Sequence, residues 1–199
     1  HQVAPSKVGG FEIPEEEAFK LYKSGDMDEK TYDAIINHKM LSNHEDEIRK
    51  GEIGSFISVM DAETANHYQK IAVEESRLGI PLIFGLDVIH GFKTMFPIPL
   101  AESCSFDDEL FEETARVAAK ESAAGGVNWT YAPMVDVARD SRWGRVAEGA
   151  GEDTYLASRF SRAKVRGFQG KDLTEEDRIA ACVILQPMEL WKEDVIMIR

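Results

Sequence analysis

The stretch that decides the fold spans Asn128 to Asp153 and has the sequence N-W-T-Y-A-P-M-V-D-V-A-R-D-S-R-W-G-R-V-A-E-G-A-G-E-D. Its first ten residues, 128–137, carry no charge before Asp136 and contain Trp, Tyr, Thr and two Val, which predicts a buried β-strand. The rest, 138–153, holds three arginines, a tryptophan, four acids and three glycines. A simple connection needs neither so much charge nor so much permissive backbone, so we predict a polar site at a strand end.

The overall charge excludes some classes of partner. The chain has 199 residues, of which 43% are apolar and 30% charged, an ordinary globular composition. A formal net charge of −13 and an absence of basic clusters disfavour nucleic acid, because a polyanion would be repelled. No apolar run approaches the ~20 residues of a membrane span, so we expect no membrane insertion.

Apolar runs alternate with segments of helical periodicity over most of the chain. Repeated strand–helix units predict an α/β fold with a parallel sheet, either doubly wound or closed into a (β/α)₈ barrel, and spacing alone leaves both open. The first fifty or so residues suggest one or two surface helices. The predicted strands are 53–60, 81–86, 128–137 and 178–183; the predicted helices follow N-caps at Asp61, Ser105 and Asp153 and end near Leu78, Ala124 and Gly167.

In either architecture, functional groups lie beyond the carboxyl ends of the strands. Asp87 comes directly after the apolar strand 81–86. Its carboxylate can accept hydrogen bonds from two adjacent sugar hydroxyls, or it can merely cap a turn. His90, beside Gly91, can act as an acid–base group or be structural.

The loop after the strand 128–137 offers three arginines, and arginine keeps its charge and its planar fork of donors when buried. We expect one arginine to enter a polar pocket and two to pair with loop acids. Trp143 can stack on a sugar or simply pack. No phosphate-binding glycine pattern and no H-E-x-x-H zinc motif is present, so we expect neither metal nor cofactor. The three arginines are Arg139, Arg142 and Arg145.

Three segments, 80–91 (I-P-L-I-F-G-L-D-V-I-H-G), 96–103 (F-P-I-P-L-A-E-S) and 128–153, resemble glycoside hydrolase family 3, more narrowly its bacterial periplasmic-type β-glucosidases. The resemblance extends from about Ile53 to Cys182. It implies a partial (β/α)₈ TIM-type barrel, roughly its first half, which a second α/β domain follows in the whole enzyme. It also implies retaining hydrolysis of terminal non-reducing β-D-glucosyl residues, and it favours a periplasmic or secreted location, which no residue here addresses.

The resemblance assigns roles to particular residues. Asp87 matches the family's aspartate that binds sugar hydroxyls, and Arg145 matches its sugar-binding arginine. We interpret Arg142, Trp143 and Glu148 as scaffold. The R-W-G-R pattern favours the glucosidase or xylosidase side of the family over the β-N-acetylglucosaminidases, without choosing between glucose and xylose.

The family's catalytic groups have no counterpart in this chain. The resemblance places the aspartate nucleophile on a later barrel strand and the acid/base carboxylate in the second domain, and retaining hydrolysis needs both. We therefore expect the chain to lack catalytic residues, to be inactive alone and to require the remaining barrel and second domain as partners. The alternatives are a non-catalytic carbohydrate-binding remnant and the product of a broken gene.

These observations divide the chain into an N-terminal helical segment (1–52), the first half of the family's barrel domain (53–183) and an aberrant tail (184–199). The family's fourth strand ends in a Lys-His pair followed by Phe. Here the sequence I-L-Q-P-M-E-L-W-K-E-D-V-I-M-I-R, which lacks that pattern, follows Val183.

We predict that the tail is a frameshift product. Permitted codons for it, translated from one base earlier, can encode H-F-A-A-Y-G-A-V-E-G-G-R-D-Y-D, which is what the family places after its lysine. Resequencing the gene should restore the Lys-His pair with this continuation. An intact frame that encodes the present tail, with no family sequence in a neighbouring frame, would contradict the prediction.

Overall fold

The computed structural model describes residues 6–8, 11–13, 15–29, 31–32 and 44–185, so nearly all of the tail lies outside the described residues. The chain forms two compact units. One comprises residues 1–54 and 68–81, and the other comprises 55–67 and 82–199. The boundary at residues 67 and 68 falls inside helix α3 (Ala62–Lys70).

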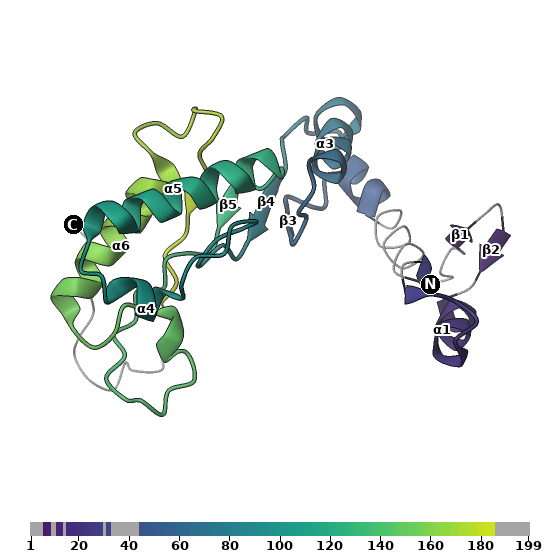
Figure 1. Ribbon diagram of the computed structural model, residues 1–199. Coiled ribbons are helices and arrows are strands. Elements are labelled where there is room, and N and C mark those ends of the chain that lie inside the picture. Colours follow the sequence, from purple (N-terminus) through teal and green to yellow (C-terminus); the bar gives the residue numbers. More distant parts are fainter. Residues whose placement is uncertain (1–5, 9–10, 14, 30, 33–43, 186–199) are drawn as a thin grey trace. The chain divides into compact units, whose positions relative to one another are not determined.

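The first unit contains more than the helices that the sequence suggested. Strands β1 (Ser6–Val8) and β2 (Phe11–Ile13) pair antiparallel, and helix α1 (Glu15–Ser24) follows (Figure 1). The π-helix η1 (Ile71–Glu75) extends α3. Burial raises the pKa of the Tyr68 hydroxyl to about 12, with the charge of Glu45 adding to the effect.

The second unit contains a four-stranded sheet whose strands are all parallel and follow one another in chain order. This arrangement confirms the predicted α/β class. Consecutive strands that pair in parallel are the arrangement of a TIM-type barrel wall rather than of a doubly wound sheet, whose strand order reverses. The strands are β3 (Ser55–Ile57), β4 (Ile83–Leu86), β5 (Trp129–Thr130) and β6 (Ala180–Ala181).

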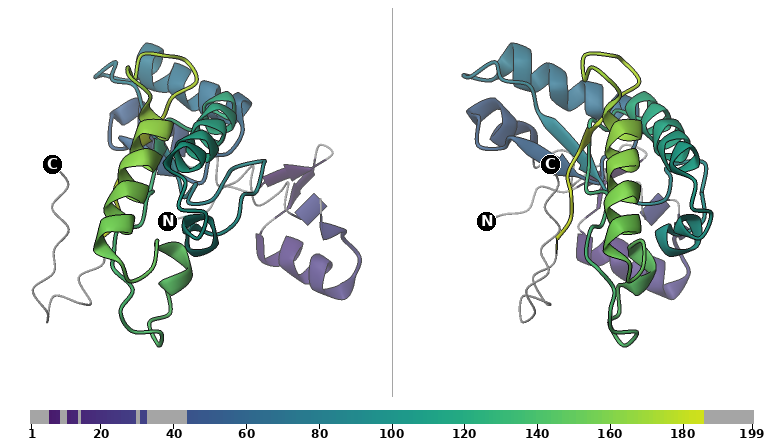
Figure 2. Two further views of the ribbon diagram at one scale, coloured as in Figure 1. Left: turned by 60° about the vertical axis from the view of Figure 1, so that its left-hand side comes forward. Right: turned by 90° about the vertical axis from the view of Figure 1, so that its left-hand side faces the viewer.

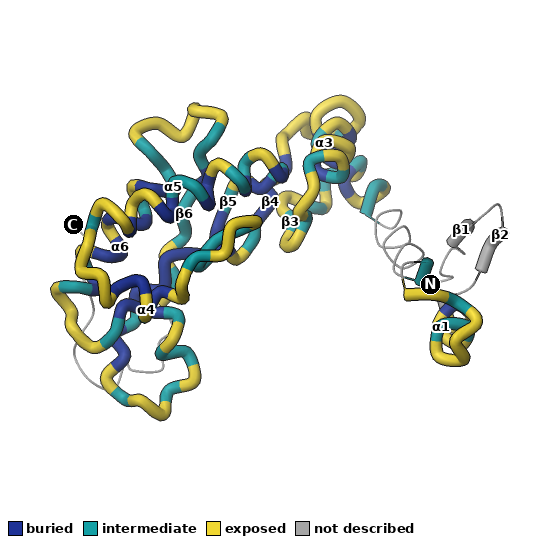
Figure 3. Tube along the Cα trace, in the orientation of Figure 1, coloured by how far each residue is buried: buried dark blue, intermediate teal, exposed yellow. Residues whose placement is uncertain are grey.

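Two long helices, α5 (Asp108–Ala124) and α6 (Thr154–Gln169), run side by side and cover one face of the sheet (Figures 1 and 2). Small residues allow the close approach: a Cβ at Gly167 of α6 would come within 2.3 Å of the Glu112 carbonyl oxygen of α5. The buried side of both helices is visible in Figure 3. Between helices and sheet lies a buried cluster of Val88, Ala115, Ala118, Ala119, Ala132, Phe168 and Ile179.

Two of the three predicted helix N-caps are confirmed, and one is wrong. The carboxylates of Asp61 and Asp153 accept hydrogen bonds from Thr64 N (2.7 Å) and Leu156 N (2.7 Å), as predicted. Helix α5, however, is capped by Asp107, which accepts from two backbone N–H groups, and not by Ser105. Both residues are good N-caps, and the prediction selected the wrong one.

The strands are shorter than predicted, and β4 is not buried on both faces. Phe84 is 2% exposed beneath the helices, whereas the neighbouring Ile83 points to the other face and is 49% exposed. Successive side chains of a strand alternate between faces, and the described helices of this unit cover one face of the sheet. After Thr130 the strand β5 ends, and the chain forms an isolated parallel bridge between Met134 and Ile184.

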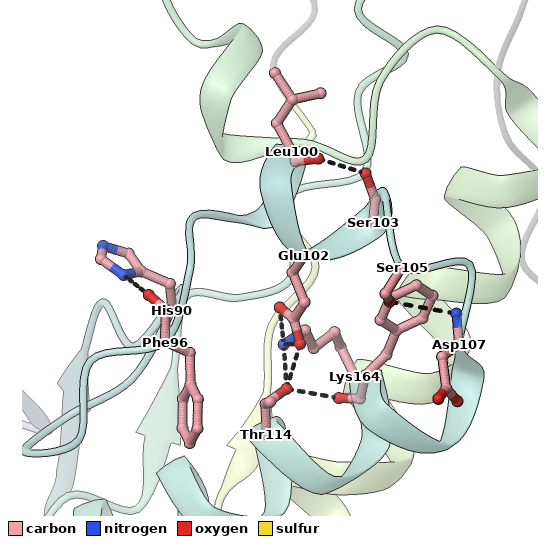
Figure 4. Close-up of polar contacts among 10 residues, drawn as sticks. His90, Phe96, Leu100, Glu102, Ser103, Ser105, Asp107, Thr114 and Lys164 are labelled. Atoms are coloured by element: carbon pink, nitrogen blue, oxygen red, sulfur yellow. Dashed lines mark hydrogen bonds and ion pairs between the residues drawn. The ribbon is translucent and has the colours of Figure 1, made fainter.

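A buried ion pair and one hydroxyl group connect three helices of this unit (Figure 4). Lys164 of α6 lies 2.6 Å from Glu102 of α4 (Pro99–Ser103), and their side chains are 3% and 1% exposed. Lys164 Nζ also donates to Thr114 Oγ1 of α5 (2.8 Å), and the Thr114 hydroxyl lies within hydrogen-bond reach of both Glu102 and the Phe111 carbonyl. Burial lowers the pKa of Lys164, while Glu102 opposes that shift.

We predict that Lys164→Met destabilises the chain by about 3–5 kcal/mol, because Glu102 is left as an unpaired buried charge. The double variant Glu102→Leu/Lys164→Met should recover most of that loss, since the Thr114 hydroxyl can still donate to Phe111. Urea unfolding measures both. The exposed Arg116–Glu113 pair is the control: Arg116→Met should cost less than about 1 kcal/mol. An equally small cost for Lys164→Met would contradict the prediction.

Candidate functional site

The candidate site lies at the carboxyl ends of β4 and β5, where the sequence placed it. Asp87 follows the last residue of β4 directly, and the loop 131–153 follows β5. Because the strands are parallel, both connections leave the sheet at the same edge. Asp87 and Arg145 are near enough that each changes the other's ionisation.

Several charges surround Asp87. Its side chain is open to solvent, yet enough protein lies around it that desolvation, followed by the charge of Glu148, raises its pKa. A backbone hydrogen bond from Ile89 and the charges of Arg145 and His90 oppose the rise. The positive charges and the backbone hydrogen bond offset these effects only in part. The Asp87 carboxylate therefore keeps the capacity to accept hydrogen bonds from a polar ligand.

The loop that carries Asp87 is held at two points. His90 Nδ1 lies 3.0 Å from the Phe96 carbonyl oxygen (Figure 4). Because a carbonyl can only accept, Nδ1 carries the proton of this hydrogen bond. Further along, Glu121 of α5 accepts from the backbone N–H groups of Lys93 (2.9 Å) and Thr94 (2.7 Å). The Thr94 hydroxyl also donates to this carboxylate (2.6 Å). That hydrogen bond, followed by the two from the backbone, lowers the pKa of Glu121, and all three attach the loop to a helix.

Arg145 is clamped by Glu148 through two of its nitrogens. Its Nε lies 2.9 and 3.1 Å from the two carboxylate oxygens of Glu148, and its Nη2 lies 2.6 Å from Oε2. Both side chains are about one-third exposed. The pKa of Arg145 is raised first by Glu148, with smaller contributions from Asp136 and Asp87. Three carboxylates therefore act electrostatically on one guanidinium, and Glu148 binds it directly.

Arg142 lies away from this cluster. Its side chain is 89% exposed and binds the carboxylate of Asp140, with Nη2 2.6 Å from Oδ2. Arg142 thus pairs with a loop acid, and its scaffold role stays a prediction. Glu148, interpreted as scaffold, binds Arg145 itself, whereas the sequence predicted that loop acids pair with the other two arginines. Its spacing of three residues from Arg145 is the signal that could have shown it. The role of Glu121 left no such signal in the sequence.

No group of three or more His, Cys, Asp or Glu side chains within the described ranges has a geometry that could hold a metal ion. In the same part of the chain, no helix is both long and apolar enough to cross a membrane.

A wall of successive parallel strands with helices on one face, and polar groups at the carboxyl edge, is the arrangement of barrel enzymes. Residues 23–182 match the model of the glycosyl hydrolase family 3 N-terminal domain. The chain belongs to this family, and the described sheet is part of its TIM-type barrel. The match begins inside the segment 1–52 and ends at Cys182, the residue at which the resemblance ends.

Relatives named β-glucosidase and relatives named β-xylosidase both match the chain. The chain is 44% identical over 124 residues to a periplasmic β-glucosidase of Salmonella typhimurium, covering 62% of this chain and 16% of that protein. A β-xylosidase of Formosa agariphila is 36% identical over 146 residues, covering 67% of this chain and 20% of that protein. The Listeria innocua β-glucosidase in complex with isofagomine has a TM-score of 0.64 at 46% identity, covering 66% and 19% of the two chains. The chain thus matches at most about a fifth of the length of these relatives.

The raised pKa of Asp87 predicts a stability effect whose direction depends on pH. The contribution of the protonated carboxyl is fully present below the ordinary value of 3.8 and is lost as the pH rises through the folded-state value. Asp87→Asn, which stays neutral, should therefore unfold at a higher urea concentration than the wild type at neutral pH. Below pH 3.8 the two should converge. An Asn variant that is less stable at neutral pH would contradict the assignment.

Proposed function

We propose that this chain forms the sugar-binding half of the barrel of a retaining β-glucosidase, which removes terminal non-reducing β-D-glucosyl residues. The observation that carries the proposal is the electrostatic coupling of Asp87 and Arg145, which lie in the two connections that leave the same edge of the sheet. Asp87 accepts hydrogen bonds from two adjacent sugar hydroxyls, and Arg145 donates to a sugar oxygen. The remaining barrel and a second domain would supply the nucleophile and the acid/base carboxylate.

Glucose is the proposed sugar, in preference to xylose. The Listeria innocua β-glucosidase has been solved in complex with glucose and is 44% identical to this chain. The β-xylosidase relative is less similar, at 36%. The surplus of carboxylates around Arg145 favours a neutral ligand rich in hydroxyl donors over an anionic one.

A chimera tests the proposal. Residues 53–182 would replace the matching segment of the Salmonella typhimurium enzyme, to which the chain is 44% identical. We expect the chimera to hydrolyse p-nitrophenyl β-D-glucoside. Its Asp87→Asn and Arg145→Met variants should each lose about 10- to 100-fold in kcat/KM, the equivalent of one charged hydrogen bond. Arg116→Met, which breaks an exposed pair on α5, is the matched control and should leave the rate unchanged.

The 199-residue chain itself distinguishes the alternatives. We expect it to bind glucose without hydrolysing the aryl glucoside, seen as slower amide hydrogen exchange near Asp87 and Arg145. A folded but inactive chimera together with glucose protection in the chain would indicate a carbohydrate-binding remnant. Failure of both would indicate the product of a broken gene.

A further inference from the structure

Glu148 binds Arg145 directly, within one short turn of the chain. It follows Arg145 by three residues and ends the 3₁₀ turn η2 (Val146–Glu148). Both of its carboxylate oxygens face Arg145, and they contact Nε and Nη2 on one edge of the guanidinium. A two-point contact to a planar group fixes its plane as well as its place, which a single hydrogen bond does not.

The turn that carries Glu148 is itself supported. The Glu148 backbone N–H donates to the Arg145 carbonyl (3.0 Å), which closes the turn. Helix α4 packs against η2, and α4 is held by the buried Glu102–Lys164 ion pair. The orientation of Arg145 therefore depends on a carboxylate whose own backbone is braced by the folded unit.

We infer that Glu148 is a positioning residue, which clamps one edge of the Arg145 guanidinium so that the side chain is fixed beside Asp87 for sugar binding. The inference rests on the proposed function, because it assumes that Arg145 contacts the sugar. Glu148 acts through Arg145 and does not touch the sugar. A long arginine side chain that is already ordered loses less conformational entropy when a ligand binds.

A double-variant cycle on the 199-residue chain tests the inference, with glucose as the probe and binding followed by NMR titration. Glu148→Gln keeps the size of the side chain and removes its charge, and it should weaken glucose binding about tenfold. Arg145→Met should weaken binding at least as much. In the Arg145→Met background, Glu148→Gln should have no further effect, because no guanidinium remains to be positioned.

The control is a second arginine–glutamate fork of similar geometry. Arg116 binds Glu113 on α5 through Nε (2.9 Å) and Nη2 (2.5 Å). Glu113→Gln should leave glucose binding unchanged. A ligand-independent measurement accompanies the titration: relaxation of the Arg145 Nε–H signal should show an ordered side chain in the wild type and a mobile one in Glu148→Gln. Unchanged amide exchange over residues 146–149 would exclude local unfolding as the cause.

The pH dependence gives an additional readout. Glu148, Arg145 and His90 are the charged or titratable groups that act on Asp87. Because Glu148 raises the pKa of Asp87, the carboxyl of Asp87 should titrate at lower pH in Glu148→Gln than in the wild type. This shift reports that the Glu148 carboxylate lies near Asp87, and the relaxation of the Arg145 Nε–H signal reports whether Glu148 orients the guanidinium.

Each contrary result has a distinct meaning. Unchanged affinity and an ordered Arg145 in Glu148→Gln would overturn the inference while leaving the proposed function intact. An equal loss in the presence and absence of Arg145 would show that Glu148 contacts the sugar directly, which also overturns it. If the wild type and all variants alike fail to bind glucose, the proposed function fails, and the inference fails with it.

Discussion

The buried contact between Lys164 and Glu102 is the interaction on which the rest of the sheet-containing unit depends. It joins α6 to α4, and Thr114 brings α5 into the same network. Both charges are almost completely removed from water, so each is tolerated only because the other is there. Helix α4 in turn packs on η2, which carries Glu148. A buried charge pair thus supports, through α4, the turn that carries Glu148.

Close packing of the helices makes that network possible. Gly167 has no room for a Cβ against the backbone of α5, and small residues, among them Ala115, Ala118, Ala157 and Ala163, contribute to the buried side of both helices. Short side chains bring the two helix axes together and reduce the distance that Lys164 must span. The sheet imposes a similar demand at Gly85, where a Cβ would come within 2.3 Å of the Tyr131 hydroxyl. Gly85 lies two residues before Asp87, and Tyr131 begins the loop that reaches Arg145. Their close approach therefore constrains the chain where both connections of the site begin.

The sequence predicted which helices and strands form better than it predicted the residues at which they begin and end. Apolar runs and N-caps located the four strands and the helices α5 and α6, because periodicity and capping are local properties. The length of β5, the exposure of Ile83 and the short helix α4 were not predictable, since they depend on which faces of the sheet find a partner. At the site, Asp87 and Arg145 were identified through the family motifs, and their sugar-binding roles remain proposals. The anchoring by Glu121 joins residues 27 and 28 positions apart and leaves no local pattern.

The spacing between Arg145 and Glu148 has a consequence for how the site is assembled. Closing a contact over three residues costs far less chain entropy than closing one over the 58 residues that separate Asp87 from Arg145. The clamp can therefore form as soon as its turn forms, before the strand ends meet. The arginine and its partner carboxylate then reach the sheet on one short segment, and the packing of α4 on η2 needs to position only that segment, not each side chain separately.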